Sequence, residues 1–248
     1  VEKEPKAEGL LNQINQLVPE GVKAAEYVER VIESVNSKSN VTVHLGTEVK
    51  AIAGYIGNYE ITLQRGEGEA IQEKVGCIVV ATGAVPLEPV GLYGYDGERV
   101  ITQMQLEEQL LNGQFKAQRV VMIQCAGARV PGREYCSRIC CMIAVKNAAL
   151  IKDQDPEAQV HILYRDIQMY GTEKERMLWD ARGKGVRFDV YDPEKPPEVK
   201  DGQVLFEQPI VGTKRQIPCD LVVLSTPLVA REGASALSQL LRIPMDQN

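Results

Sequence analysis

Arg119-Val-Val-Met-Ile-Gln-Cys-Ala-Gly-Ala-Arg129 contains a short apolar run that ends at a glycine-containing turn, as a buried strand does. Apolar residues then recur at helical spacing over 136–152, and 160–164 is again an apolar strand pattern. A second helix is predicted at 174–182 and a third strand at 186–191. Strand–helix–strand–helix–strand is typical of a doubly wound parallel sheet.

The flanking sequence extends this pattern in both directions. After it, 193–217 predicts a small antiparallel insertion, 219–225 a strand that returns to the sheet, and 234–241 a closing helix. Before it, an amphipathic helix is predicted at 22–35, followed by strands at 41–45, 48–53, 59–63 and 77–81. Residues 84–117 are predicted to be a connector that contains one short helix, at 103–111.

The order of these elements predicts an α/β protein with two Rossmann-like, three-layer units and small antiparallel β insertions. We expect residues 1–115 to be the C-terminal portion of a nucleotide-binding domain, so that the first unit is incomplete. Residues 116–230 would form the second, NAD-domain-like unit, and 231–248 would return towards the first domain. The chain does not begin with Met, which indicates a removed tag or a fragment. Because the half of the first unit that would hold a cofactor's pyrophosphate would lie before Val1, we expect an internal fragment.

Composition excludes several classes of function. The chain has 248 residues and a net charge of −6, whereas nucleic-acid-binding proteins carry basic patches. No apolar run approaches the ~18 residues that cross a bilayer, and the N-terminus does not resemble a signal peptide. We therefore expect a cytoplasmic protein with no nucleic-acid partner and no direct membrane insertion.

Four of the six cysteines lie close together in the pattern Cys125-x10-Cys136-x3-Cys140-Cys141. Cys125 follows the first strand of the second unit, and Cys136 is expected to open the next helix with Cys140 one turn later. In an open α/β sheet a ligand binds at this position, outside the strand ends and at a helix N-terminus. The positive end of the helix would stabilise thiolates there.

Three interpretations of this cluster remain open at this point. Four thiolates suit an iron–sulfur cluster. They also suit structural zinc, although adjacent cysteines are awkward for the usual zinc knuckles. The third interpretation is buried thiols or dithiol–disulfide chemistry. The remaining cysteines, Cys77 and Cys219, lie in apolar strand patterns and are expected to pack as small hydrophobic residues.

A flavin signal is present in the first unit. Cys77-Ile-Val-Val-Ala-Thr-Gly83 is an apolar strand pattern that ends in Ala81-Thr82-Gly83, an element that resembles part of the FAD domain of glutathione- and thioredoxin-reductase-type flavoproteins. A glycine there allows the cofactor to approach the backbone. A G-x-G-x-x-G fingerprint is missing, since Gly66-Glu-Gly68 lies in a polar hairpin rather than at a strand-to-helix turn.

The chain resembles the A subunit of heterodisulfide reductase and its relatives over most of its length. The most specific match is Tyr135-Cys-Ser-Arg-Ile-Cys-Cys-Met142. Further matches are Tyr93-Gly94, Val100-Ile-Thr102, Val120 to Gln124, Cys125-Ala-Gly127, Lys146-Asn147, Ile162-Leu-Tyr-Arg-Asp166, Tyr170-Gly171 and Gly185-Val-Arg-Phe188.

This resemblance implies a thioredoxin-reductase-like flavoprotein core that holds FAD, with a [4Fe–4S] cluster in the second unit. The implied metal ligands are Cys125, Cys136, Cys140 and Cys141, and Ala81, Thr82 and Gly83 would contact the FAD. The implied activity is that of an oxidoreductase subunit that transfers electrons between FAD and the cluster. Its implied partners are other subunits of an electron-transfer complex, and a homodimer is also possible.

The chain departs from that family in lacking ferredoxin-type C-x2-C-x2-C-x3-C runs. The isolated fragment is accordingly expected to be inactive, with FAD bound by the full-length protein. Two alternative functions stay open: a non-catalytic module that docks partners, with structural zinc or metal-free cysteines, and a dithiol–disulfide reductase.

Overall fold

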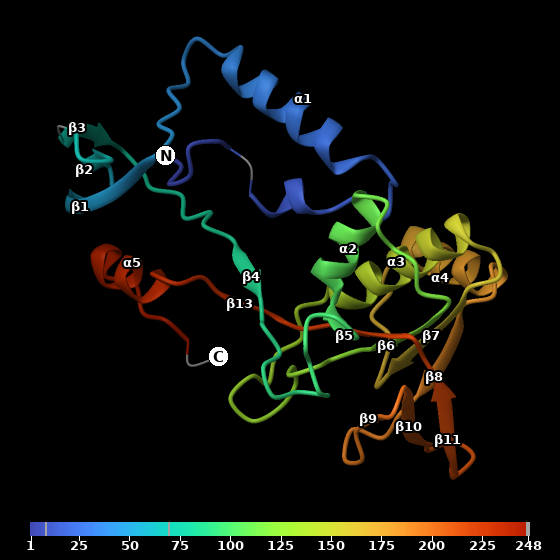
Figure 1. The fold of residues 1–248 in the computed structure, drawn as a ribbon. Helices are drawn as coiled ribbons and strands as arrows, with labels where there is room; N and C mark the ends of the chain where they lie inside the picture. The colour runs from blue at the N-terminus through green and yellow to red at the C-terminus, as the bar shows by residue number, and fades with distance from the viewer. Residues whose placement is uncertain (8, 69, 247–248) are drawn as a thin grey trace. The chain divides into compact units, whose positions relative to one another are not determined.

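The computed structural model describes residues 1–7, 9–68 and 70–246 (Figure 1). The chain divides into two compact units. Unit 1 contains 1–12, 24–85 and 230–247, and unit 2 contains 13–23 and 86–229. The two-stranded sheet of β4 (Ala84–Pro86) and β13 (Leu228–Ala230) lies where the chain passes between the units.

Unit 2 is built on a parallel five-stranded sheet in the order β5-β12-β6-β7-β8. These strands are β5 (Val100–Thr102), β12 (Leu221–Leu224), β6 (Arg119–Ile123), β7 (Gln159–Tyr164) and β8 (Arg187–Val190). Parallel sheets are covered on both faces, which explains the nearly continuous apolar runs in these strands.

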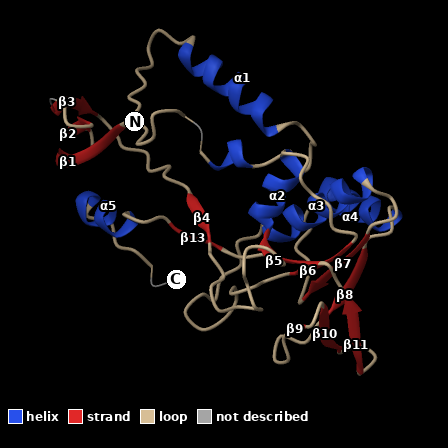
Figure 2. Ribbon diagram, viewed as in Figure 1, coloured by secondary structure: helices blue, strands red, loops and turns tan. Residues whose placement is uncertain are grey.

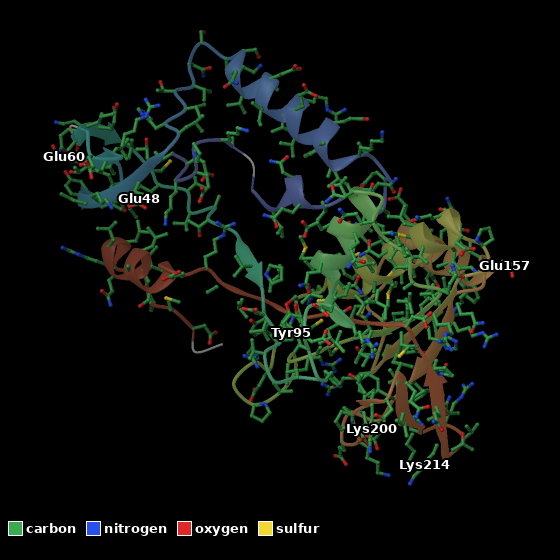
Figure 3. All side chains as sticks on the ribbon, in the orientation of Figure 1. Glu48, Glu60, Tyr95, Glu157, Lys200 and Lys214 are labelled. Carbon is green, nitrogen blue, oxygen red and sulfur yellow. The ribbon has the colours of Figure 1, made fainter. Side chains whose placement is uncertain are left out.

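Helices cover one face of this sheet and a small antiparallel sheet covers the other (Figures 1 and 2). The helices are α2 (Gln103–Leu111), α3 (Cys140–Gln154) and α4 (Thr172–Gly183). The antiparallel strands are β9 (Glu198–Lys200), β10 (Gln203–Gln208) and β11 (Thr213–Pro218), near Lys200 and Lys214 in Figure 3.

The alternation of β6 divides the core of unit 2 in two. Val120 and Met122 belong to the core beneath the helices, whereas Val121 and Ile123 belong to the core shared with β10 and β11. Successive side chains of a strand point to opposite faces, so one apolar strand serves both layers. β6 is therefore fixed from both sides, and the nearby Cys125 starts from a rigid support.

Unit 1 combines helices with an antiparallel sheet. It contains α1 (Ala24–Asn36), α5 (Ala234–Leu241), most of a short 3-10 helix at Leu10–Gln13, and the sheet β1-β2-β3. The strands are β1 (Thr47–Tyr55), β2 (Asn58–Arg65) and β3 (Ala70–Val75), and Glu48 and Glu60 mark this sheet in Figure 3.

The structure confirms the α/β class, the parallel sheet and the antiparallel insertion, and corrects three local predictions. The segments 41–45 and 77–81 are not strands, and Val79 is 83% exposed; the chain leading into β4 is drawn as loop in Figure 2. A strand requires a neighbour for its backbone groups, and none of the described strands pairs with either segment. The helix of the Cys motif begins at Cys140 rather than Cys136. β3, β4, β5 and β13 were not expected, and β4 and β5 lie in the segment predicted as a connector.

No helix among the described residues is long and apolar enough to cross a membrane.

Candidate iron–sulfur site

The four clustered cysteines lie in unit 2, around the carboxyl end of β6 and the N-terminus of α3. Cys125 comes two residues after β6, Cys136 lies in the connecting loop, and Cys140 and Cys141 are the first two residues of α3. Cys136 is exposed, Cys125 and Cys140 are partly buried, and Cys141 is buried. The strand, the loop and the helix thus bring together the residues that the sequence singled out.

The loop that joins β6 to α3, residues 125–139, is tied to its surroundings by specific bonds. The Arg133 Nε donates to the Gly127 carbonyl at 2.8 Å. The Tyr135 hydroxyl donates to the Leu228 carbonyl at 2.7 Å, and the Leu228 N–H donates to the Ser137 hydroxyl at 2.9 Å. Both neighbours of Cys136 are therefore fixed to one residue of β13.

Backbone strain is concentrated at this loop. Six described residues other than glycine have positive φ, and four of them lie in the loop or against it: Tyr93, Cys125, Arg129 and Arg138, with φ between 52° and 61°. Each such residue costs about 1–3 kcal/mol, and strain of this kind gathers at ligand sites. Cys125 adopts its left-handed conformation between Gln124 and Ala126, whose N–H groups donate to the carbonyls of Leu163 and Ser225.

The thiols are close enough to influence one another's ionisation. Burial is the main cause that raises the pKa of Cys140 to about 12, and the neighbouring Cys141, Cys125 and Cys136 contribute to that rise. Burial likewise raises the pKa of Cys141 to about 11 and raises the pKa of Cys125. These groups are therefore protonated at neutral pH, and a bound cationic centre is what would stabilise them as thiolates.

Two arginines oppose this effect at Cys125. Arg129 and Arg165 both lower the pKa of the Cys125 thiol against the larger effect of burial. Arg129 Nη1 donates to both carboxylate oxygens of Asp166, at 2.7 and 2.8 Å. Arg165 Nη1 donates to the Arg129 carbonyl at 3.1 Å. The result is a positively charged side to the site.

Further polar groups surround the sulfurs. The Arg138 N–H donates to Cys136 Sγ at 3.4 Å, and the Gln168 backbone N–H bonds the Cys141 thiol. The Cys140 thiol donates to the Thr226 carbonyl at 3.4 Å. α3 begins without a side-chain cap at Ile139, so its positive N-terminal dipole end is directed at the site.

The residues present fit an iron–sulfur cluster. Four sulfur donors, N–H groups that bond sulfur and a helix N-terminus all favour an anionic iron–sulfur centre. Next to Cys125, the Gln124 amide and the Arg165 Nε are buried without a hydrogen-bond partner among the described residues, so both have hydrogen-bonding capacity left for a ligand. No three His, Cys, Asp or Glu side chains of the described chain are arranged to hold a single metal ion.

Sequence reasoning missed several residues that shape this site. Tyr135 and Ser137 lie within the Cys motif but had no assigned role, while Thr226, Leu228 and Gln168 come from other strand ends. The available signal was topological, because β12, β6 and β7 are neighbours in a parallel sheet and their carboxyl ends share one edge.

The segment expected to contact FAD lies in unit 1. Ala81, Thr82 and Gly83 are exposed, and Gly83 has a φ of +68° with open space around the position of a Cβ. This backbone is accessible to a ligand. The described contacts do not form a pocket that would identify the ligand.

The fold is that of thioredoxin-reductase-like FAD/NAD(P) oxidoreductases. The thioredoxin reductase of T. acidophilum superposes with a TM-score of 0.58 at 14% identity, covering 94% of this chain and 69% of that chain. The bacillithiol disulfide reductase of Bacillus cereus superposes with a TM-score of 0.53 at 15% identity, covering 92% of this chain and 69% of that one. No protein-family model matches the chain.

Sequence comparison identifies the family more narrowly. An iron-sulfur A subunit of the CoB–CoM heterodisulfide reductase of Methanopyrus kandleri is 38% identical over 205 residues, which is 71% of this chain and 30% of the relative. The A subunit of the H₂/formate:CoB–CoM heterodisulfide,ferredoxin reductase of Methanococcus maripaludis is 38% identical over 68% of this chain and 29% of its own length. Over the matched residues the chain is homologous to the A subunits of heterodisulfide reductases, and it spans about 30% of the length of these relatives.

Proposed function

We propose that the protein is part of an oxidoreductase subunit in which Cys125, Cys136, Cys140 and Cys141 bind a [4Fe–4S] cluster. The observation that carries this proposal is the gathering of four cysteines around one strand end and one helix N-terminus, where Cys125, Cys136 and Cys141 each raise the pKa of another of the four. The names of the relatives as iron-sulfur subunits support the same interpretation. A bound cluster would supply one-electron transfer.

The described residues would hold the cluster in defined ways. Cys140 and Cys141 are fixed by α3, whereas Cys136 depends on the bonds of Tyr135 and Ser137 to Leu228. The Arg138 and Gln168 N–H groups would keep donating to coordinated sulfur, while the Cys140 thiol would give up its proton and its bond to Thr226.

We further propose that FAD binds the full-length protein, with Ala81, Thr82 and Gly83 of unit 1 among its contacts. The thioredoxin-reductase-like fold and the exposed backbone at Gly83 support this assignment. Residues 1–115 would then be the C-terminal portion of the FAD domain, 116–230 the cluster domain and 231–248 the return segment. The electron route would run between FAD and the cluster and on to other subunits of a multisubunit complex, as the names of the relatives suggest.

The test is anaerobic purification followed by iron and acid-labile sulfide assays. We expect about four irons and four sulfides per chain, as the [4Fe–4S] formula requires, and a large loss of both in Cys140→Ala. The matched control is Cys219→Ala, which removes a buried thiol outside the cluster. Full iron in Cys140→Ala would overturn the ligand assignment, and zinc without iron in the unaltered protein would favour a structural site.

A further inference from the structure

Arg165 differs from the other charged residues of the site because only part of its guanidinium is hydrogen-bonded. The residue follows β7 directly, and its Nη1 donates to the Arg129 carbonyl at 3.1 Å. Its Nε is buried and has no hydrogen-bond partner among the described residues. Leaving a buried guanidinium N–H without an acceptor costs free energy. We therefore expect the ligand of this site to interact with the Arg165 Nε–H.

The two arginines beside Cys125 differ in how their charges are balanced. Arg129 is held by both oxygens of Asp166, which offsets its charge locally. Arg165 bonds a neutral carbonyl, and no ion pair involving it occurs in the described part of the chain. Asp166 also feels the charge of Arg165, but its hydrogen-bonded ion pair is with Arg129, so Arg165 is the less balanced of the two charges.

The charge of Arg165 acts on the interior of the site. It opposes the burial that raises the pKa of Tyr93 and of Tyr191. The Tyr191 hydroxyl donates to the carbonyl of Gln124 at 2.8 Å, directly before Cys125. Arg165 thus faces the end of β6 where negative charge would collect.

We propose that Arg165 is a positioning residue that raises the reduction potential of the cluster, by placing beside Cys125 a positive charge held in no ion pair of the described residues and an N–H donor that has no partner among them. This inference rests on the proposed function. The couple is the oxidised cluster plus one electron giving the reduced cluster, without a proton. Since reduction adds one negative charge, a nearby cation stabilises the reduced form more than the oxidised form.

The test is a redox titration of the anaerobic protein with dithionite as the one-electron donor, followed by electron paramagnetic resonance. In Arg165→Gln we expect the equilibrium constant for reduction to fall by up to about tenfold, which corresponds to 59 mV for a one-electron couple. Arg165→Lys keeps the charge and loses the Nε donor, so its potential should lie between those of Arg165→Gln and the unaltered protein.

One control separates local charge from net charge. Arg176→Gln removes a charge from an exposed position on α4. It should change the equilibrium constant less than twofold. A shift in Arg165→Gln no larger than that of Arg176→Gln would overturn the inference.

The iron content tells whether the proposed function or only the Arg165 inference is wrong. If the proposed function is wrong, the unaltered protein will bind no iron, whereas failure of the Arg165 inference leaves iron and sulfide intact and the potential unmoved. If Arg165→Gln does not retain iron, Arg165→Met, which keeps the apolar stem of the side chain, is titrated in its place. An unchanged potential in that variant would likewise reject the inference.

Discussion

The hydroxyl of Tyr135 donates to the backbone carbonyl of Leu228 at 2.7 Å, across 93 positions of sequence. The N–H of the same Leu228 donates to Ser137, so a single residue of β13 holds the chain on both sides of Cys136. Cys136 is the exposed member of the cluster and belongs to no helix or strand. Its position is therefore set by these two bonds rather than by secondary structure.

Replacing Tyr135 with Phe tests this arrangement. The variant leaves the Leu228 carbonyl without its donor, and we expect the free energy of unfolding to fall by about 1 kcal/mol. Because Cys136 loses one of its two supports, iron should be released to a chelator faster than from the unaltered protein. The control is Tyr170→Phe, which alters an exposed tyrosine that contacts Lys174. Equal rates of iron release in the two variants would contradict the role of Tyr135.

Gly127 makes a separate prediction about the same loop. It has a φ of +77°, and a Cβ there would lie 2.9 Å from Leu87 Cδ2 and 3.0 Å from Leu92 Cδ1. Gly127→Ala should destabilise the protein by about 1–2 kcal/mol from the left-handed backbone alone, with the two contacts adding to that cost.

Gly132 provides the matched control for Gly127. Its φ is +81°, and open space surrounds the position of its Cβ. Gly132→Ala therefore carries the backbone cost without the contacts, and urea unfolding of both variants isolates the close approach to the leucines. If Gly132→Ala proved as destabilising as Gly127→Ala, the packing of the loop against Leu87 and Leu92 would be of no consequence.

The elements of unit 2 could be predicted from the sequence because its buried strands are apolar runs. The apolar runs at 119–124 and 160–164 are buried on both faces, and their parallel pairing requires the helices between them. The segment 77–81 has the same apolar pattern and forms no strand. Pattern alone cannot reveal whether a neighbouring strand is available, since pairing depends on residues distant in sequence.

The site was predictable in its residue types but not in its supports. The spacing of Cys125 to Cys141 indicated a shared centre, because a strand end and a helix start meet at one edge of the sheet. The left-handed turns at Cys125 and Arg138 do not follow from residue type, since arginine and cysteine seldom adopt positive φ. The bonds to Leu228 arise from tertiary contact alone.

A buried ion pair joins two helices of unit 2, α2 and α3. Lys146 of α3 bonds Glu107 of α2, and their side chains are 7% and 0% exposed. Glu107 also accepts from the Asn15 N–H at 3.0 Å, and Lys146 donates to the Gln16 carbonyl at 3.2 Å. The pair therefore fastens the segment 13–23 to both helices.

Lys146→Met would leave the Glu107 carboxylate buried and unpaired, at a cost of about 3–5 kcal/mol in the free energy of unfolding. Lys146→Met/Glu107→Leu removes both charges and should recover more than about 1 kcal/mol of that loss, although the Asn15 N–H then lacks its acceptor. Urea titration of the single and double variants measures the difference. A double variant that is less stable than the single variant would show that the carboxylate does not depend on Lys146.

The buried His161 leads to a prediction of how the free energy of unfolding depends on pH. It lies on β7 with its Nδ1 buried, 3.8 Å from Asp189 Oδ2. Burial is the main cause that lowers its pKa below the usual 6.5; Arg187 and Arg215 lower it too, and Asp189 opposes them. As the pH falls through about 6.5, the unfolded chain binds a proton that the folded protein refuses. The free energy of unfolding should therefore decrease from about pH 6.5 down to the lowered pKa.

His161→Gln cannot take up that proton in either state, so it should lose less stability than the unaltered protein between about pH 7.5 and about pH 5.5. Its stability at the higher pH is not the readout, since a buried amide brings hydrogen-bonding needs of its own. Urea midpoints measured at both pH values give the two slopes. Parallel slopes would mean that the groups around His161, including the Asp189–Arg215 pair at 2.6 Å, already accommodate the imidazolium in the folded state.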